Sequence, residues 1–177
     1  VENQLKFVSF FERTFTALKV LAMYAERLIW PFNLSADYSY QRIAIVGNIF
    51  KSPEALLGLI LLGGLLWLAI KYRHNDTTKF SLGAGAVLFL FPYLMISNLV
   101  RPVGTIMGER LMYFPSLGFV ILLAWLLQRL FQSSRFNLGI FGIVLSAITV
   151  FYGTLTIDRN KVWKDSRTLF YATVKES

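Results

Sequence analysis

The sequence contains no cysteine and only one histidine. The lack of cysteine excludes disulfide bonds and thiolate metal sites, and it leaves the redox environment of the protein open. His74 cannot build a metal site alone, and we expect it to be solvated because it stands in a charged segment. We therefore predict no metal-binding residues, while a metal requirement stays open.

Charged residues are also scarce. They make up 16% of the 177 residues, against about 25% in an average soluble domain. Hydrophobic residues reach 55%, and uncharged runs cover residues 80–100, 111–128 and 136–157. Each run has about the 18–20 residues that a helix needs to cross a hydrocarbon core of ~30 Å. Because the backbone must satisfy its own hydrogen bonds in lipid, these runs indicate membrane helices and exclude a soluble globular domain.

The predicted fold is all-α: a polytopic helical membrane protein with about five spanning helices. The spans are expected near residues 10–30, 53–70, 80–100, 115–128 and 136–157. The first is amphipathic and ends at Trp30-Pro31, an aromatic belt residue followed by a helix stop. Pro53 and Pro115 suit the first turns of their helices, and Pro92 predicts a kink.

Residues 158–177 differ in character from the membrane region, which we bound at 1–157. Asn160 is suited to cap a helix whose apolar positions, beginning with Val162 and Trp163, follow a period of 3.6. We predict that this tail starts a helical region outside the membrane. Because the chain begins with Val1, we expect it to be part of a longer protein.

The net charge of +8 is spread over all interhelical segments, which argues against nucleic acid and favours the lipid bilayer as partner. The short turns after residues 70 and 128 are basic, so the positive-inside rule predicts that they face the cytoplasm. The N-terminus is then expected inside and the C-terminus outside. The two polar loops, 31–52 and 101–114, share the outer face.

Asp37 and Tyr38 stand among hydroxyl residues in the first outer loop. Asp37 has two interpretations of about equal weight. It caps a local turn, which needs no further role, or it joins Tyr38 in holding a polar acceptor such as a sugar hydroxyl. Arg42 is a basic residue of the same loop.

The second outer loop carries Glu109 and Arg110 side by side, just before a predicted span. Adjacent helical residues do not face each other, so each is expected to contact a different partner. Charges at this depth are costly and are kept as ion pairs between helices or as site residues. Arg101 and Arg110 are candidates for binding a lipid-linked phosphate through two parallel hydrogen bonds.

Three segments carry a resemblance to a known family: residues 31–39 (PFNLSADYS), 108–119 (GERLMYFPSLGF) and 159–163 (RNKVW) with Leu169-Phe170. In order and spacing, they resemble the transmembrane-and-tetratricopeptide-repeat (TPR) proteins. Animal members of that family are O-mannosyltransferases of the endoplasmic reticulum. The resemblance implies the C-terminal half of a GT-C-type membrane domain that takes a polyprenyl-phosphate-linked sugar on the outer face.

The resemblance implies that the catalytic carboxylate lies upstream of this segment, so no catalytic residue is assigned and the segment alone is expected to be inactive. The candidate donor- and substrate-binding residues are Asp37, Tyr38, Arg42, Arg101, Glu109, Arg110 and Tyr113. The partners implied are the bilayer, a lipid-linked sugar and a protein acceptor, which downstream repeats would help to bind. A prokaryotic cytoplasmic membrane is slightly favoured over the endoplasmic reticulum. The alternative is a non-catalytic membrane anchor that presents repeats to other proteins.

Overall fold

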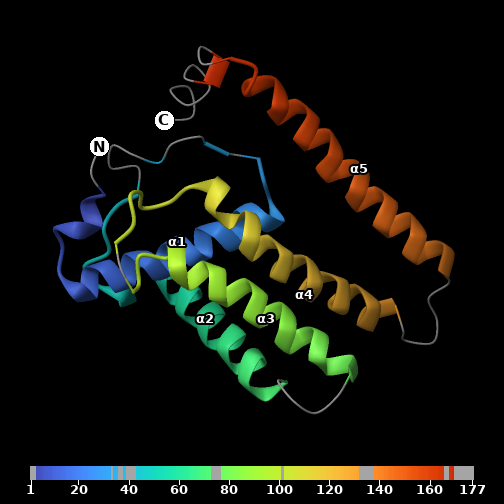
Figure 1. Ribbon diagram of the computed structural model, residues 1–177, viewed down its shortest axis with the longest axis horizontal. Helices are drawn as coiled ribbons and strands as arrows, with labels where there is room; N and C mark the ends of the chain where they lie inside the picture. The colour runs from blue at the N-terminus through green and yellow to red at the C-terminus, as the bar shows by residue number, and fades with distance from the viewer. Residues whose placement is uncertain are drawn as a thin grey trace.

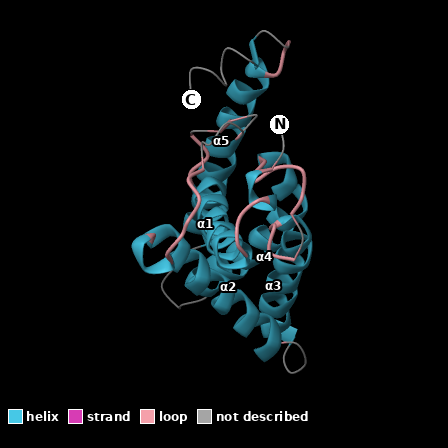
Figure 2. Ribbon diagram, turned by 90° about the vertical axis from the view of Figure 1, so that its left-hand side faces the viewer, coloured by secondary structure: helices cyan, strands magenta, loops and turns pink. Residues whose placement is uncertain are grey.

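The computed structural model describes residues 3–32, 34–35, 38, 43–72, 77–100, 102–131, 138–165 and 168–169. Within these ranges it consists of helices and loops with no strand, so the predicted all-helical fold is confirmed (Figures 1 and 2). The α-helices are α1 (Phe10–Ile29), α2 (Pro53–Lys71), α3 (Thr77–Ile96), α4 (Tyr113–Phe131) and α5 (Leu138–Val162). The short 3-10 helices are η1 (Gln4–Lys6), η2 (Ile49–Lys51) and η3 (Glu109–Met112).

The helix ends follow local capping chemistry. Ser9 and Glu12 form a reciprocal capping box at the start of α1, where the Ser9 amide donates to Glu12 at 2.9 Å. Ser52 caps α2, with Pro53 in its first turn as the sequence predicts. α4 begins at Tyr113, two residues before its predicted start, because it continues directly from η3.

Three of the five helices, Pro53–Lys71, Glu109–Phe131 (η3 and α4 together) and Gly139–Val162, are long and apolar enough to cross a membrane. The apolar part of α3, Phe80–Ile96, is shorter, and α1 is not apolar enough to be counted with them. Of the residues in these three apolar helices, only 11%, 17% and 0% are buried within the chain, which fits helices that face lipid. The described part of the chain is therefore that of an integral membrane protein.

Helices α2, α3 and α4 form a bundle in which glycines allow close backbone contact. A Cβ atom on Gly118 of α4 would lie 2.3 Å from the Phe89 nitrogen of α3. A Cβ atom on Gly58 of α2 would lie 1.8 Å from the Leu18 carbonyl oxygen of α1. Small residues at such contacts are typical of membrane helices, where packing rather than hydrophobic burial drives association.

Helix α1 runs across one end of this bundle rather than alongside it (Figure 1). Both of its flanks contact the segment between α3 and α4. Before α1, the Asn3 side chain donates to the Val103 carbonyl at 2.7 Å. Near the end of α1, the Tyr24 hydroxyl donates to the Gly108 carbonyl at 3.0 Å and accepts from the Gly108 amide at 2.8 Å. The two flanks of α1 therefore lie at the same end of the bundle.

Asn98 fixes the segment that leaves α3. Its φ of 59° lies in the left-handed region, which Asn tolerates better than other non-glycine residues, and α3 ends at Ile96 instead of the predicted residue 100. The buried Asn98 side chain accepts hydrogen bonds from Asn3 at 2.8 Å and from the Val103 amide at 2.8 Å. This network connects the N-terminal segment to the second loop.

Helix α5 is separated from α4 along most of its length (Figure 1), and its middle contacts the C-terminal end of α1 and the residues that follow. Its Tyr152 hydroxyl donates to the Leu28 carbonyl at 3.0 Å, and Phe151 packs against Phe32. The helix continues to Val162, so Asn160 lies inside it and does not cap a new helix as the sequence predicted. Neither Gly nor Pro interrupts residues 158–162, and Lys161 pairs with Asp158 one turn away.

The cap of the next helical turn is Asp165. Its carboxylate accepts from the Thr168 amide at 2.8 Å, and its carbonyl accepts from the Leu169 amide at 3.1 Å. After α5, the described residues form a turn at 163–165 and new helical residues at 168–169, while the predicted domain boundary at residue 157 stays a prediction. The rest of the predicted tail helix, from residue 170, lies outside the described residues.

Candidate functional site

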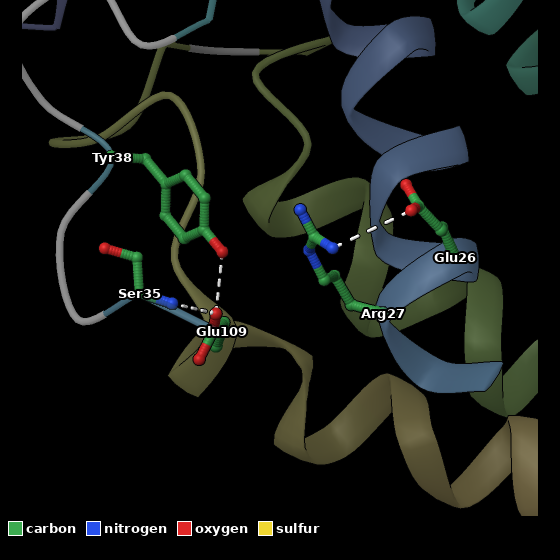
Figure 3. A network of polar contacts seen from close by, with 5 residues as sticks. All are labelled: Glu26, Arg27, Ser35, Tyr38 and Glu109. Carbon is green, nitrogen blue, oxygen red and sulfur yellow. Dashed lines mark hydrogen bonds and ion pairs between the residues drawn. The ribbon is translucent and has the colours of Figure 1, made fainter. Parts of the chain in front are cut away.

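The two polar loops meet at Glu109. This residue opens η3, directly before α4, and its carboxylate accepts two hydrogen bonds from the first loop (Figure 3). The Ser35 amide and the Tyr38 hydroxyl each donate to Glu109 Oε1 at 2.6 Å. Residues more than 70 positions apart are thus joined by one carboxylate. This contact holds the first loop against the start of η3.

Tyr38 is a hydrogen-bond donor at any ordinary pH. Its side chain is buried, and burial together with the hydrogen bond to Glu109 raises the pKa of Tyr38 to about 12. The phenol therefore stays protonated, and its O–H group points at Glu109 Oε1. Ser35 is buried as well, so its amide depends on the same carboxylate.

Tyr24 positions the chain just before Glu109. Its hydroxyl bonds to both the amide and the carbonyl of Gly108, which fixes the backbone orientation from which Glu109 extends. The Tyr24 ring in turn rests against Tyr93 of α3, with the ring centroids 6.3 Å apart. Tyr93 is fully buried and donates to the Ala17 carbonyl of α1 at 3.2 Å. A chain of aromatic contacts therefore connects the bundle core to the site.

Arg27 supplies a positive charge on the α1 side of the site. Its side chain extends from the last turn of α1 on the side where Tyr38 of the first loop meets Glu109 (Figure 3). Arg27 attracts the Glu109 carboxylate, as does Arg159 from the end of α5. Arg27 also forms an ion pair with the neighbouring Glu26 at 3.7 Å. The Glu26 carboxylate is exposed, and ion pairs at the surface contribute little to stability. The Arg27 Nε is buried without a hydrogen-bond partner among the described residues.

A hollow of about 480 Å³ lies beside Arg27, between the end of α1, the following segment and the end of α5. It is bordered by two arginines and an aspartate, and by a larger number of apolar and aromatic side chains. Its lining residues are Arg27, Leu28, Pro31, Phe32, Leu34, Tyr152, Leu155, Thr156, Asp158, Arg159, Asn160, Val162 and Trp163. The hollow thus combines cationic groups with an apolar wall at the end of a membrane helix.

Tyr38, Glu109, Arg110 and Tyr113, the predicted site residues that the structure describes, do not line this hollow. Arg110 and Tyr113 are exposed, and neither lines it. Within the described ranges, the Arg110 side chain forms no hydrogen bond or ion pair, so the interhelical ion pair that was one of its two interpretations has no partner there. Asp37, Arg42 and Arg101 lie outside the described residues. No cluster of three His, Asp or Glu side chains that would hold a metal ion occurs in the described part of the chain.

Sequence reasoning missed Tyr24, Arg27 and Arg159. Tyr24 and Arg27 stand on a helix that was expected to cross the membrane, and Arg159 was expected in a tail. The available signal was the short spacing between Arg27 and the Pro31-Phe32 motif, which brings that arginine to the first loop.

These features define a helical integral membrane protein with a polar site at one end of its helix bundle. Several named proteins are similar to it in sequence. The chain is 30% identical to Protein O-mannosyl-transferase TMTC3 of Homo sapiens over 165 residues, which are 92% of this chain and 18% of that protein. It is 26% identical to Protein O-mannosyl-transferase TMTC1 of Mus musculus over 166 residues, again 92% of this chain and 18% of the relative. With Protein O-mannosyl-transferase F38B6.6 of Caenorhabditis elegans it shares 25% over 175 residues, 96% of the chain and 24% of the relative.

The resemblance stated from the three motifs is thereby confirmed over most of the chain. The chain spans about a fifth of the length of the curated relatives it matches. No family model matches the sequence, and no solved structure matches it.

Proposed function

We propose that the chain is part of a membrane glycosyltransferase of the GT-C class that transfers a sugar from a polyprenyl-phosphate donor to a protein acceptor. The observation that carries this proposal is the meeting of both polar loops at Glu109, beside a hollow bordered by Arg27 and Arg159. The names of the relatives support hexosyl transfer, specifically mannosyl transfer, and do not favour the non-catalytic anchor.

The donor's phosphate would bind to Arg27 and Arg159. A guanidinium forms paired hydrogen bonds with phosphate. The donor's phosphodiester carries one negative charge and the departing polyprenyl phosphate up to two, so the two guanidiniums would stabilise the leaving group most. The apolar wall of the hollow, which includes Phe32 and Trp163, would hold the first part of the polyprenyl chain as it enters the bilayer. The buried Nε of Arg27, which has no partner among the described residues, supports this role because buried donors are normally satisfied.

Glu109 and Tyr38 would orient the sugar or the acceptor hydroxyl rather than activate it. Among the described residues, two donors reach Glu109 through one oxygen, and its other oxygen would accept a hydrogen bond from a substrate hydroxyl. The catalytic carboxylate is expected in the upstream part of the family's membrane domain. TPR repeats downstream would help to bind the protein acceptor.

We propose the non-cytoplasmic face of the membrane as the location of the site. At the opposite end of the bundle, the last turns of α2 and α4 carry Lys71 and Arg129. The positive-inside rule assigns this end to the cytoplasm. The relatives reported above are animal proteins, which favours the endoplasmic reticulum and gives no support to a prokaryotic membrane.

The test measures sugar transfer by the full-length protein carrying Arg27→Gln, with Arg110→Gln as the matched control. Loss of a charge-assisted bond to phosphate is worth about 1.5–3 kcal/mol, so Arg27→Gln should lower kcat/KM for the lipid-linked donor by about 10- to 100-fold. Arg110→Gln removes the same charge from an exposed residue and should change transfer less than about 3-fold.

Arg27→Lys separates charge from geometry, and it should recover part of the donor affinity because it keeps the charge without the paired donors. The reverse pattern, with transfer lost in Arg110→Gln and kept in Arg27→Gln, would assign the phosphate to Arg110. Equal activity in all three variants would reject a phosphate site at either arginine.

A further inference from the structure

Helix α1 was expected to cross the membrane, but its contacts restrict where its two ends lie. Asn3, seven residues before α1, is held by Asn98 and Val103. Tyr24, in the last two turns of α1, is held by Gly108. Residues 98–108 follow α3 and precede α4, and the apolar helices begin or end beside them. A helix whose two flanks bind the same interhelical segment cannot place those flanks on opposite sides of a bilayer.

The surfaces of α1 agree with this position. One side of the helix is buried: the Leu18 backbone lies against Gly58 of α2, and the Ala17 carbonyl accepts a hydrogen bond from Tyr93 of α3. The same helix carries Glu12, Arg13, Lys19, Glu26 and Arg27, which is more charge than a spanning helix of 20 residues normally tolerates. It is strongly amphipathic, as helices that lie in a membrane interface are.

An aromatic cluster marks the outer flank of α1. Phe7, Phe10 and Phe11 have exposed fractions of 75%, 62% and 68%. The Phe10 and Phe11 rings contact each other with centroids 5.8 Å apart, and the Arg13 guanidinium lies 5.4 Å from the centre of the Phe10 ring. In the loop before α2, Phe50 is 83% exposed next to Lys51. Aromatic rings together with basic side chains are characteristic of the level of the lipid headgroups.

We propose that α1 does not cross the bilayer but lies along its outer surface, with Phe7, Phe10 and Phe11 inserted among the lipid headgroups. The partner of this face is the membrane itself. The helix that carries Phe10 and Phe11 contacts the first turns of the apolar helix α2, which begins at Pro53. The chain then crosses the membrane four times, through α2 to α5, and residue 3 lies on the same side as Glu109. This inference is independent of the proposed transfer reaction.

Sidedness gives the first test, and the absence of native cysteine in this segment makes it simple. Single cysteines replace Phe7, Gly47 or Lys71, all exposed, in a full-length protein whose other cysteines have been removed. The protein is placed in sealed vesicles and treated with a membrane-impermeant maleimide. We expect Phe7→Cys and Gly47→Cys to react from one side and Lys71→Cys from the other. Reaction of Phe7→Cys together with Lys71→Cys would show that α1 spans the membrane and would overturn the proposal.

Depth gives the second test. A nitroxide attached at Phe11→Cys is compared with one at Glu26→Cys, whose native side chain is 61% exposed. Collisions with oxygen, which concentrates in lipid, should dominate at position 11. Collisions with a water-soluble nickel complex should dominate at position 26. Equal and high nickel accessibility at both positions would show that α1 stands in water, which also contradicts the proposal.

Discussion

Replacing Glu109 with Ala should remove the connection between the two polar loops. The Ser35 amide and the Tyr38 hydroxyl would each lose their hydrogen bond to the Glu109 carboxylate. A hydrogen bond to a charged group is worth about 1.5–3 kcal/mol, so Glu109→Ala should lower the free energy of unfolding by about 2–5 kcal/mol, with non-additivity keeping it below the full sum. Glu109→Gln retains one acceptor oxygen without the charge, and its loss should be about half as large.

The assay compares thermal and denaturant unfolding of the full-length protein in detergent, with Arg110→Ala as control. Arg110 is the next residue of η3 but is exposed, so its replacement should change stability by less than about 0.5 kcal/mol. Limited proteolysis reports the loop separately, and Glu109→Ala should accelerate cleavage within residues 31–52. Equal unfolding of Glu109→Ala and Arg110→Ala would refute the view that this carboxylate holds the loops together.

Two further predictions concern packing and pH. Gly118→Ala places a methyl group 2.3 Å from the Phe89 nitrogen, so α3 and α4 must separate and stability should fall by about 1–3 kcal/mol. Gly142→Ala in α5 meets nothing within 4 Å and should leave the melting temperature unchanged. Because the pKa of Tyr38 is raised from 10.0 to about 12, its stabilising contribution is complete below pH 10 and is lost between pH 10 and 12. The stability of Tyr38→Phe should therefore fall less over that range, and identical pH profiles would contradict the role of the phenol as donor.

The sequence predicted those helices whose position follows from a long apolar run or from a local capping motif. The uncharged runs account for α3, α4 and α5, and Ser52 with Pro53 accounts for the start of α2. Errors arose where tertiary contacts decide the boundary. α3 ends early because Asn98 takes a left-handed conformation within a buried network, and no local pattern indicates those partners. Asn160 resembles a cap, yet the helix continues because nothing interrupts it before Trp163.

Two residues of the candidate site were named from the sequence, but their pairing was not. Glu109 and Tyr38 were both recognised as polar residues near the membrane, while their contact depends on how two loops fold over α1. Arg27 was missed because it was expected on a spanning helix, and nothing in the sequence indicates that it lies close to a loop. Arg110 was emphasised because it adjoins Glu109, but successive residues of η3 point in different directions.

The position of α1 connects the two proposals physically. Tyr24 holds the backbone before Glu109, and Arg27 borders the hollow, so α1 fixes the depth of the site relative to the bilayer. A helix lying among the headgroups would hold these side chains at the level where the phosphate of a lipid carrier lies, with its hydrocarbon chain below. A spanning α1 would carry Arg27 on a helix free to tilt with the bilayer, whereas a surface helix bound at both flanks keeps the arginine at one depth. Phosphate recognition by Arg27 is therefore expected to depend on the anchoring of Asn3 and Tyr24, although neither residue borders the hollow.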